Sequence, residues 1–418
     1  MDADRQAGGA SAGLVPLRRN RDFNLLWTGQ AVSGLGSAMS GICYPLLILA
    51  ITGSAAKAGI VGGVSLVTNL LLLLPAGVVA DRYPRKRIMV ITALAQLTVV
   101  GTVVPAAFAH HVYIAQLVAV GAVQGAASAF YIGASRGAMR RVVPTPQLSQ
   151  AYARAQARDQ AVSLVGAPAG GALFSLAQFL PFACDSFSFG CIAVATALIR
   201  TSLDPSPVAT GPREPLRRSI TTGLQFIFRE PFLRTIALWG AGVNSVVAGM
   251  SLMVIVLARQ HGATPTVIGL LLSVNAAAGV IGSLFAPRLV AIVGGRNLAL
   301  AASWLLPAGA VGIAFAPSLW LIAVRGAVTM LMIAPVNVIF AAYAAQVTPD
   351  HLQAQAGNAM QLCVNSFGWL ALPVFGVLAD SLGIRSAILV GAGLFALIAV
   401  GIQFAPHLDQ LDRKDAGQ

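Results

Sequence analysis

Long uncharged apolar runs alternate with short polar segments along almost the whole chain. Each run is about as long as the roughly 20 residues that an α-helix needs to cross a bilayer. Twelve such windows are present, at residues 23–50, 58–80, 88–112, 113–135, 160–180, 181–199, 235–258, 264–287, 297–316, 318–345, 353–378 and 386–405. The pattern predicts an all-α membrane protein with twelve transmembrane helices.

The composition agrees with this interpretation. Of 418 residues, 57% are hydrophobic and only 10% are charged, which leaves too little polar surface for a soluble fold. Residues 1–20 lack the apolar core of a signal peptide, so we expect no cleaved leader. The four cysteines show no metal-ligand spacing and are interpreted as packing residues, which predicts no metal site: Cys43, Cys184, Cys191 and Cys363.

The positive charge is distributed in a way that indicates topology. The chain carries a net charge of +13, which by itself is also typical of nucleic-acid binding. If the N-terminus is cytoplasmic and the spans alternate, all 27 Lys and Arg lie on the inner side except Lys57, Arg259, Arg325 and Arg385. Such an excess of inner cations fixes orientation in membrane proteins. We therefore expect a multi-pass plasma-membrane protein with both termini in the cytoplasm and no nucleic-acid partner.

Two halves of the chain resemble each other at an offset of about 205 residues. Pro168 and Gly171 in the fifth span match Pro373 and Gly376 in the eleventh. Internal repeats of this kind are common in transporters. The predicted organisation is an N-terminal tail (1–22), a six-helix half (23–199), a linker (200–234), a second six-helix half (235–405) and a C-terminal tail (406–418). The linker contains a basic amphipathic stretch, residues 217–229, expected to lie along the inner membrane surface.

The segment between the second and third spans, Gly77-Val-Val-Ala-Asp-Arg-Tyr-Pro-Arg-Lys-Arg87, is the most strongly charged loop of the first half. Gly77 would let the second helix approach a neighbour closely, and Asp81 could accept hydrogen bonds from a helix N-terminus or pair with an arginine. Such contacts would form in one arrangement of the halves and break in the other. For the cations Arg82, Arg85, Lys86 and Arg87, the alternative is that they only set topology.

Gly77, Ala80, Asp81, Arg82, Arg85 and Lys86 resemble the loop signature of the major facilitator superfamily, although Val79 and Pro84 depart from it. The resemblance implies the fold of that superfamily, with two pseudo-symmetric six-helix halves. It also implies that Gly77, Asp81, Arg82, Arg85 and Lys86 form a conformational latch that stabilises the outward-facing state.

Three further segments resemble the drug and siderophore exporter group of this superfamily, which includes macrolide and enterobactin exporters. They are Leu17 to Phe23, the Val143-Pro144 region, and Asp185-Ser-Phe-Ser-Phe189. In the fifth span, Gly166, Pro168, Gly170 and Gly171 are similar to a helix-packing motif of exporters. Glycine permits close helix contact, and proline permits a bend.

Ionisable residues in membrane spans are costly, and so each is a candidate for function. Asp185 in the sixth span could carry a proton, pair with a cation or cap a helix. Arg325 in the tenth span could meet an anionic substrate or extend its side chain toward the interface. Arg136, at the inner end of the fourth span, is interpreted as an interfacial anchor.

Uncharged polar residues in the spans could line a substrate cavity or form hydrogen bonds between helices. Asn244, Asn275 and Asn337 are the main candidates, beside Asn69, Gln124, Tyr131, Tyr343, Asn365 and Trp369. A cavity of this kind suits a bulky, weakly polar compound more than a sugar or a phosphate.

The sequence thus predicts a secondary transporter that works by alternating access and is not an enzyme. It contains no Gly-x-x-x-x-Gly-Lys loop for ATP and no catalytic Ser, His and Asp arrangement. The expected function is export of a hydrophobic or amphiphilic small molecule (a drug, macrolide, siderophore or secondary metabolite) by proton antiport, with the proton gradient as energy source, no cofactor and a monomeric protein. The alternatives are a metabolite importer or facilitator, and a receptor or scaffold without transport.

Overall fold

The computed structural model describes residues 16–204, 216–349, 352–405 and 408, and all regular structure in these ranges is helical. The first half consists of α2 (Arg21–Thr52), α3 (Ala55–Arg82), α4 (Arg85–Gly101) continued by α5 (Val103–Phe108), α6 (Ile114–Val142), α7 (Leu148–Leu176) and α8 (Leu180–Ala197). The second half consists of α10 (Pro231–Gln260), α11 (Pro265–Val293), α12 (Gly295–Ala314), α13 (Leu319–Val347), α14 (Gln353–Asn365) with α15 (Gly368–Leu382), and α16 (Ile384–Gln403). Helix α9 (Leu216–Arg229) precedes α10, and short 3-10 turns occupy Leu17–Arg19 (η1) and Thr145–Gln147 (η2).

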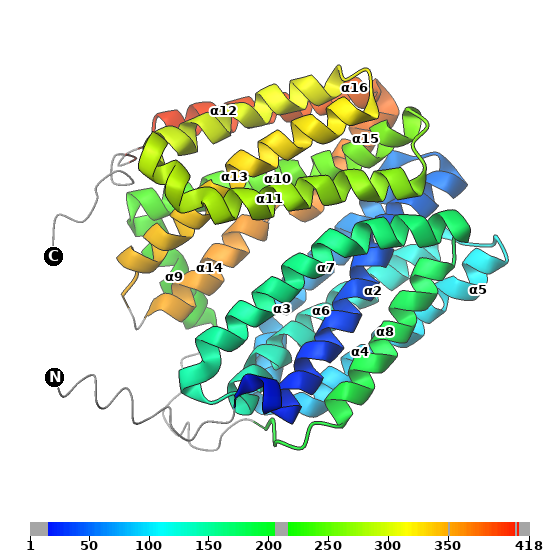
Figure 1. Ribbon diagram of the computed structural model, residues 1–418, viewed down its shortest axis with the longest axis vertical. Helices are drawn as coiled ribbons and strands as arrows, with labels where there is room; N and C mark the ends of the chain where they lie inside the picture. Colours follow the sequence, from blue (N-terminus) through cyan, green and yellow to red (C-terminus); the bar gives the residue numbers. More distant parts are fainter. Residues whose placement is uncertain (1–15, 205–215, 350–351, 406–407, 409–418) are drawn as a thin grey trace.

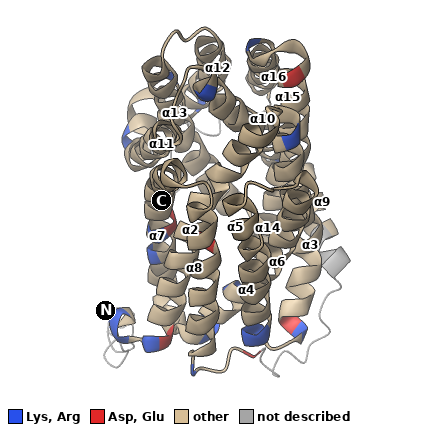
Figure 2. Ribbon diagram, turned by 90° about the vertical axis from the view of Figure 1, so that its right-hand side faces the viewer, with Lys and Arg blue, Asp and Glu red and all other residues tan. Residues whose placement is uncertain are grey.

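Eleven helical segments of the described chain are long and apolar enough to cross a membrane. The fifth predicted span, α7, is not among them because the half of this helix that begins at Leu148 is polar, yet it packs along α2 and α11 like the other spans. With α7 included, the predicted all-α fold of twelve spans in two halves is confirmed. Charged residues lie mostly near helix ends (Figure 2).

Three spans differ from the sequence prediction. The third span is interrupted at Thr102, between α4 and α5. Helix α7 begins at Leu148 instead of near residue 160, because its polar first half is held against α2. There, Arg158 donates to the side chain of Gln30 at 2.7 Å, and the Trp27 indole donates to the Arg154 carbonyl at 3.3 Å. The eleventh span is broken between α14 and α15, at Ser366 and Phe367.

Local sequence explains where α2 ends and α3 begins. Gly53 adopts φ 65°, a left-handed conformation that glycine tolerates and that terminates α2. Ser54 follows as the N-cap of α3, and its hydroxyl accepts a hydrogen bond from the Lys57 amide at 3.2 Å. The two helices therefore reverse direction within two residues.

In Figure 1 the first half forms the lower part of the molecule and the second half the upper part. We call the end of the bundle that carries Arg82 to Arg87 and Arg140 to Arg141 the basic end. The end where α3 and α11 begin is called the opposite end. The most extensive contacts between the halves are two helix crossings, α3 with α15 and α7 with α11.

Glycines bring the backbones into direct contact at both crossings. A side chain at Gly59 of α3 would collide with the Leu372 carbonyl of α15, and one at Gly376 of α15 would lie 2.5 Å from the Ala55 carbonyl. At the second crossing, side chains at Gly269 and Gly171 would collide with the carbonyls of Ala167 and Pro265, respectively. The repeat positions noted in the sequence, at Pro168 with Gly171 and Pro373 with Gly376, thus lie at equivalent crossings that close the opposite end.

Candidate functional site: a cavity between the halves

A cavity of about 990 Å³ lies between the two halves. Helices α3 and α6 of the first half and α10 and α14 of the second supply most of its wall. It extends from Leu66 and Gly368 in the middle of the bundle to Asp81 and Arg141 at the basic end. Because Asp81 and Arg141 are exposed to solvent, the cavity opens at this end.

The inner wall of the cavity combines leucines with carboxamides. Its apolar part includes Leu66, Leu70, Leu73, Leu74 and Leu362. The carboxamides on the wall are Asn69, Asn244, Gln355, Asn358, Gln361 and Asn365. Apolar surface with a few polar groups is typical of sites for bulky small molecules. The wall can therefore bury an apolar ligand and offer it hydrogen bonds without a charged partner.

Charged side chains line the cavity at its mouth. They are Asp81, Arg85, Arg136, Arg140 and Arg141, so cations outnumber the carboxylate among the described lining residues. This arrangement disfavours a cationic ligand at the entrance and permits a neutral or anionic one.

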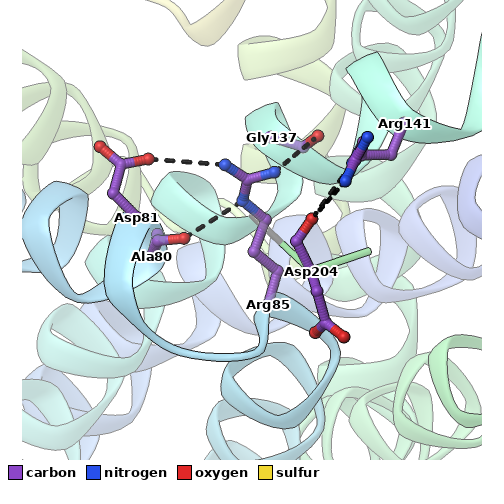
Figure 3. A network of polar contacts seen from close by, with 6 residues as sticks. All are labelled: Ala80, Asp81, Arg85, Gly137, Arg141 and Asp204. Carbon is purple, nitrogen blue, oxygen red and sulfur yellow. Dashed lines mark hydrogen bonds and ion pairs between the residues drawn. The ribbon is translucent and has the colours of Figure 1, made fainter. Parts of the chain in front are cut away.

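Arg85 holds the loop between α3 and α4 against α6 (Figure 3). Its guanidinium donates to the Ala80 carbonyl at 3.1 Å and to the Gly137 carbonyl at 3.5 Å, and lies 3.5 Å from the Asp81 carboxylate. A side chain at Gly137 would overlap the guanidinium of Arg85, so Arg85 would have to leave this position if another residue replaced the glycine. These contacts all lie within the first half.

Two other cations near this loop bind backbone carbonyls at the end of the first half and in the linker. Arg141 donates twice to the Asp204 carbonyl, at 2.9 and 3.1 Å (Figure 3), and Lys86 donates to the Ile199 carbonyl at 2.9 Å. Gly77 faces the cavity, and apart from its own helix no described atom lies within 4 Å of the place that a Cβ would occupy. Of the predicted latch, Gly77, Asp81 and Arg85 line the cavity, whereas Arg82 and Lys86 do not. Its contact with the second half stays a prediction.

The glycine motif of α7 packs on two neighbours. Side chains at Gly166 and Gly170 would collide with Ala38 and with the Met39 carbonyl of α2. Gly171 faces α11 of the other half, and Pro168 lies against Gly269 of α11. This motif therefore packs α7 against α2 of its own half and against α11 of the second half.

Asp185 of α8 is fully buried between α2 and α8, away from the cavity. Its carboxylate accepts hydrogen bonds from the hydroxyls of Ser40 at 2.5 Å and Ser37 at 3.2 Å. In the part of the chain that the structure describes, no cation forms an ion pair with it. Serine hydroxyls thus surround the buried carboxylate, with Ser188 of α8 beside the two from α2.

The structure separates the remaining candidates. Arg136 and Asn244 line the cavity. Arg325 donates to the Gly312 carbonyl of α12, and so it binds within the second half. Asn275 packs against Gly326 of α13, and its buried carboxamide oxygen has no hydrogen-bond partner among the described residues. Asn337 is exposed on α13 and does not line the cavity.

Sequence reasoning missed most of the polar face of α14. Gln355, Asn358 and Gln361 line the cavity beside Asn365, which was noted. The spacing of three to four residues between successive amides would have placed them on one helix face. Asp380 was also missed, because the predicted window ended at residue 378 whereas α15 continues to Leu382.

Two six-helix halves around a central cavity define a membrane transporter and not an enzyme. The family model described as Major Facilitator Superfamily matches residues 26–257 and 247–416, and the chain belongs to this superfamily.

Similar proteins include the multidrug efflux pump Tap of Mycolicibacterium fortuitum, 27% identical over 399 residues that cover 93% of this chain and 96% of the pump. Tap of Mycobacterium tuberculosis (strain ATCC 25618 / H37Rv) is 25% identical over 373 residues, 87% of this chain and 88% of the pump.

Solved structures of other transporters share the fold. A bacterial homolog of the human lysosomal transporter Spinster, in an inward-facing and occupied conformation, superposes with a TM-score of 0.74 at 13% identity, covering 97% of this chain and 100% of its own. A bacterial homologue of the iron transporter ferroportin, in an inward-facing state, gives a TM-score of 0.69 at 16% identity, over 91% of this chain and 98% of its own.

Proposed function

We propose that this protein exports hydrophobic or amphiphilic small molecules, of the class that multidrug efflux pumps carry, by alternating access. The observation that carries the proposal is the cavity of about 990 Å³ between the halves, walled by leucines and carboxamides and closed at the opposite end. The similarity to Tap along nearly the whole chain supports a drug as the substrate.

The basic end faces the cytoplasm in this proposal, with both termini on that side. The support is the distribution of Lys and Arg, which favours the inner side in membrane proteins. The arrangement in Figure 1 is then inward-open, and substrate enters the cavity from the cytoplasm or the inner leaflet. One chain supplies the complete cavity, which supports a monomer as the functional unit.

Proton antiport drives export in this proposal, without a bound cofactor, and Asp185 carries the proton. Charge on a fully buried carboxylate without a cationic partner costs free energy, and taking up a proton removes that cost. Two of the serine hydroxyls that bind Asp185 come from α2, so protonation would change how α2 and α8 are joined. Because a hydroxyl can also accept a hydrogen bond, the site holds both protonation states.

Accumulation assays test the export proposal. The chain is expressed in cells that lack their own major pumps, and the uptake of a fluorescent dye, a macrolide and a tetracycline is measured with and without a protonophore. We expect accumulation to fall several-fold and to recover when the protonophore is added. Unchanged accumulation across such a panel would exclude export, and raised uptake of a nutrient would indicate an importer.

Asp185→Asn tests the coupling residue, because asparagine keeps the size of the side chain but cannot exchange a proton. We expect this variant to lose protonophore-sensitive export while its abundance in the membrane is unchanged. Asp204→Asn is the matched control, since Asp204 binds Arg141 through its backbone carbonyl and not through its carboxylate. If Asp185→Asn retains full protonophore-sensitive export, Asp185 is not the residue that carries the proton.

A further inference from the structure

A carboxylate of the second half caps a helix of the first half at the opposite end. The side chain of Asp380, near the end of α15, accepts a hydrogen bond from the Ser54 hydroxyl at 2.6 Å. It also accepts from the backbone amides of Ala55 at 2.9 Å and Ala56 at 3.0 Å, the first two residues of α3. Three donors from one half therefore converge on one carboxylate of the other.

This cap completes the first turn of α3. The first amides of a helix have no partner within the helix and carry partial positive charge. Ser54 accepts from the Lys57 amide, and Asp380 accepts from the two amides before it. Hydrogen bonds to a charged acceptor are about twice as strong as those between neutral groups. When α3 and α15 separate at this end, these amides lose a partner that only the other half provides.

The second crossing lacks such a charge. At the place equivalent to Asp380, 205 residues earlier, α7 carries Ser175, whose hydroxyl lies 3.1 Å from that of Thr266 on α11. Helix α11 begins at Pro265, which has no amide hydrogen to cap, and Thr264 accepts from the Val267 amide at 3.4 Å. The two crossings share their glycines and prolines, but the carboxylate belongs to one of them.

The same helix pair carries another carboxylate at its basic end. Asp81 lies near the end of α3 on the cavity wall, across from α14. The N-cap position of α14 is Leu352, and no side-chain hydrogen bond caps that helix among the described residues. Asp380 near the C-terminal end of α15 thus caps the start of α3, and Asp81 holds the corresponding position near the C-terminal end of α3.

We propose that Asp380 is an outer latch that stabilises the inward-open arrangement and must release α3 before the opposite end opens. It acts in reciprocal fashion to the latch predicted for Asp81, so that one cap is made while the other is broken. This inference rests on the proposed alternating access, and its test needs no substrate.

Distances between spin labels in the purified full chain in lipid nanodiscs measure the two arrangements. The four native cysteines are replaced, and pairs are introduced as His111→Cys with Ser318→Cys at the opposite end and Ser149→Cys with Asn297→Cys at the basic end. These four positions are exposed, and each pair joins the two halves. Double electron–electron resonance then gives the populations of short and long distances.

Asp380→Ala should shift the ratio of inward-open to outward-open molecules about fivefold toward the outward-open form, the effect typical of removing a helix cap. The distance should lengthen at the opposite end and shorten at the basic end. Asp380→Asn, which keeps one acceptor and the side-chain shape, should shift the ratio less, and it serves if the alanine variant does not yield folded protein. Asp204→Asn removes a carboxylate of the linker that bonds locally to Ser202 and should leave both distributions unchanged.

Unchanged distributions in both Asp380 variants, with monodisperse protein, would overturn the latch. A shift equal to that of Asp204→Asn would do the same. Failure of the export proposal is distinguishable, because a clear shift without any drug efflux keeps the latch and removes the export function. Drug efflux with unshifted distances removes the latch and keeps the export function.

Discussion

The two ends of helix α3 differ in how closely they pack against the second half. At the opposite end, its backbone touches α15 at Gly59, and Asp380 caps its first turn. At the basic end, it borders a cavity of about 990 Å³, and a Cβ at Gly77 would meet no described atom outside its helix. One helix therefore borders both the closed end of the cavity and its open end. We call these two contact regions with the second half the gates. Tilting α3 so that it closes one gate would open the other.

The largest effect is expected from Gly59→Val. The valine side chain would collide with the Leu372 carbonyl, and overpacking of this kind costs about 1–3 kcal/mol. The opposite end should stay open, and efflux should fall at least about tenfold. The assay is drug accumulation, together with the spin-label distance at the opposite end.

Gly279→Val is the matched control, because the site of a Cβ at Gly279 is open space in the described structure. Equal loss of efflux in both variants would mean that glycine in these helices serves membrane insertion and not gate closure.

A smaller, opposite effect is expected from Gly77→Val at the other end of α3. In the present arrangement the valine meets no described atom outside its helix, so folding should be unaffected. If this surface closes on α14 during transport, the side chain will block closure and hold the protein inward-open. Efflux should fall several-fold while the basic-end distance stays long. Normal efflux would show that Gly77 does not take part in closure.

The smallest effect is expected from Asn69→Ala, between the two ends. The Asn69 carboxamide donates to the Gly125 carbonyl of α6 at 3.1 Å, and such interhelical bonds average about 0.6 kcal/mol in membranes. The midpoint of thermal unfolding should fall by only about one or two degrees. Neither gate distance should change, because α3 remains packed on α6. A shift at one gate alone would mean that α3 bends and does not tilt as one body.

Hydropathy predicted the number of spans well because each apolar window is long and bounded by charge. It failed for the first half of α7, since a helix can continue past the bilayer when residues such as Arg158 find partners on a neighbouring helix. It also could not reveal the break at Ser366 and Phe367, because both broken and continuous helices satisfy the same apolar pattern.

Of the site residues named from the sequence, Arg136 and Asn244 line the cavity, whereas Asn337 is exposed on α13, and the sequence could not distinguish these positions. The side to which a polar residue points depends on packing, and a span that is apolar all round gives no periodic signal. Asp380 was missed for a different reason. Its importance comes from donors about 325 residues away, and only the tertiary structure brings them together.

The linker helix α9 is in contact with the wall of the cavity. Helix α9 packs against α14, where a side chain at Gly223 would lie 2.5 Å from the Gln355 carbonyl. Part of the linker between the halves therefore supports α14, which forms one wall of the cavity. In the proposed alternating access, α14 cannot move without displacing α9 or breaking this contact.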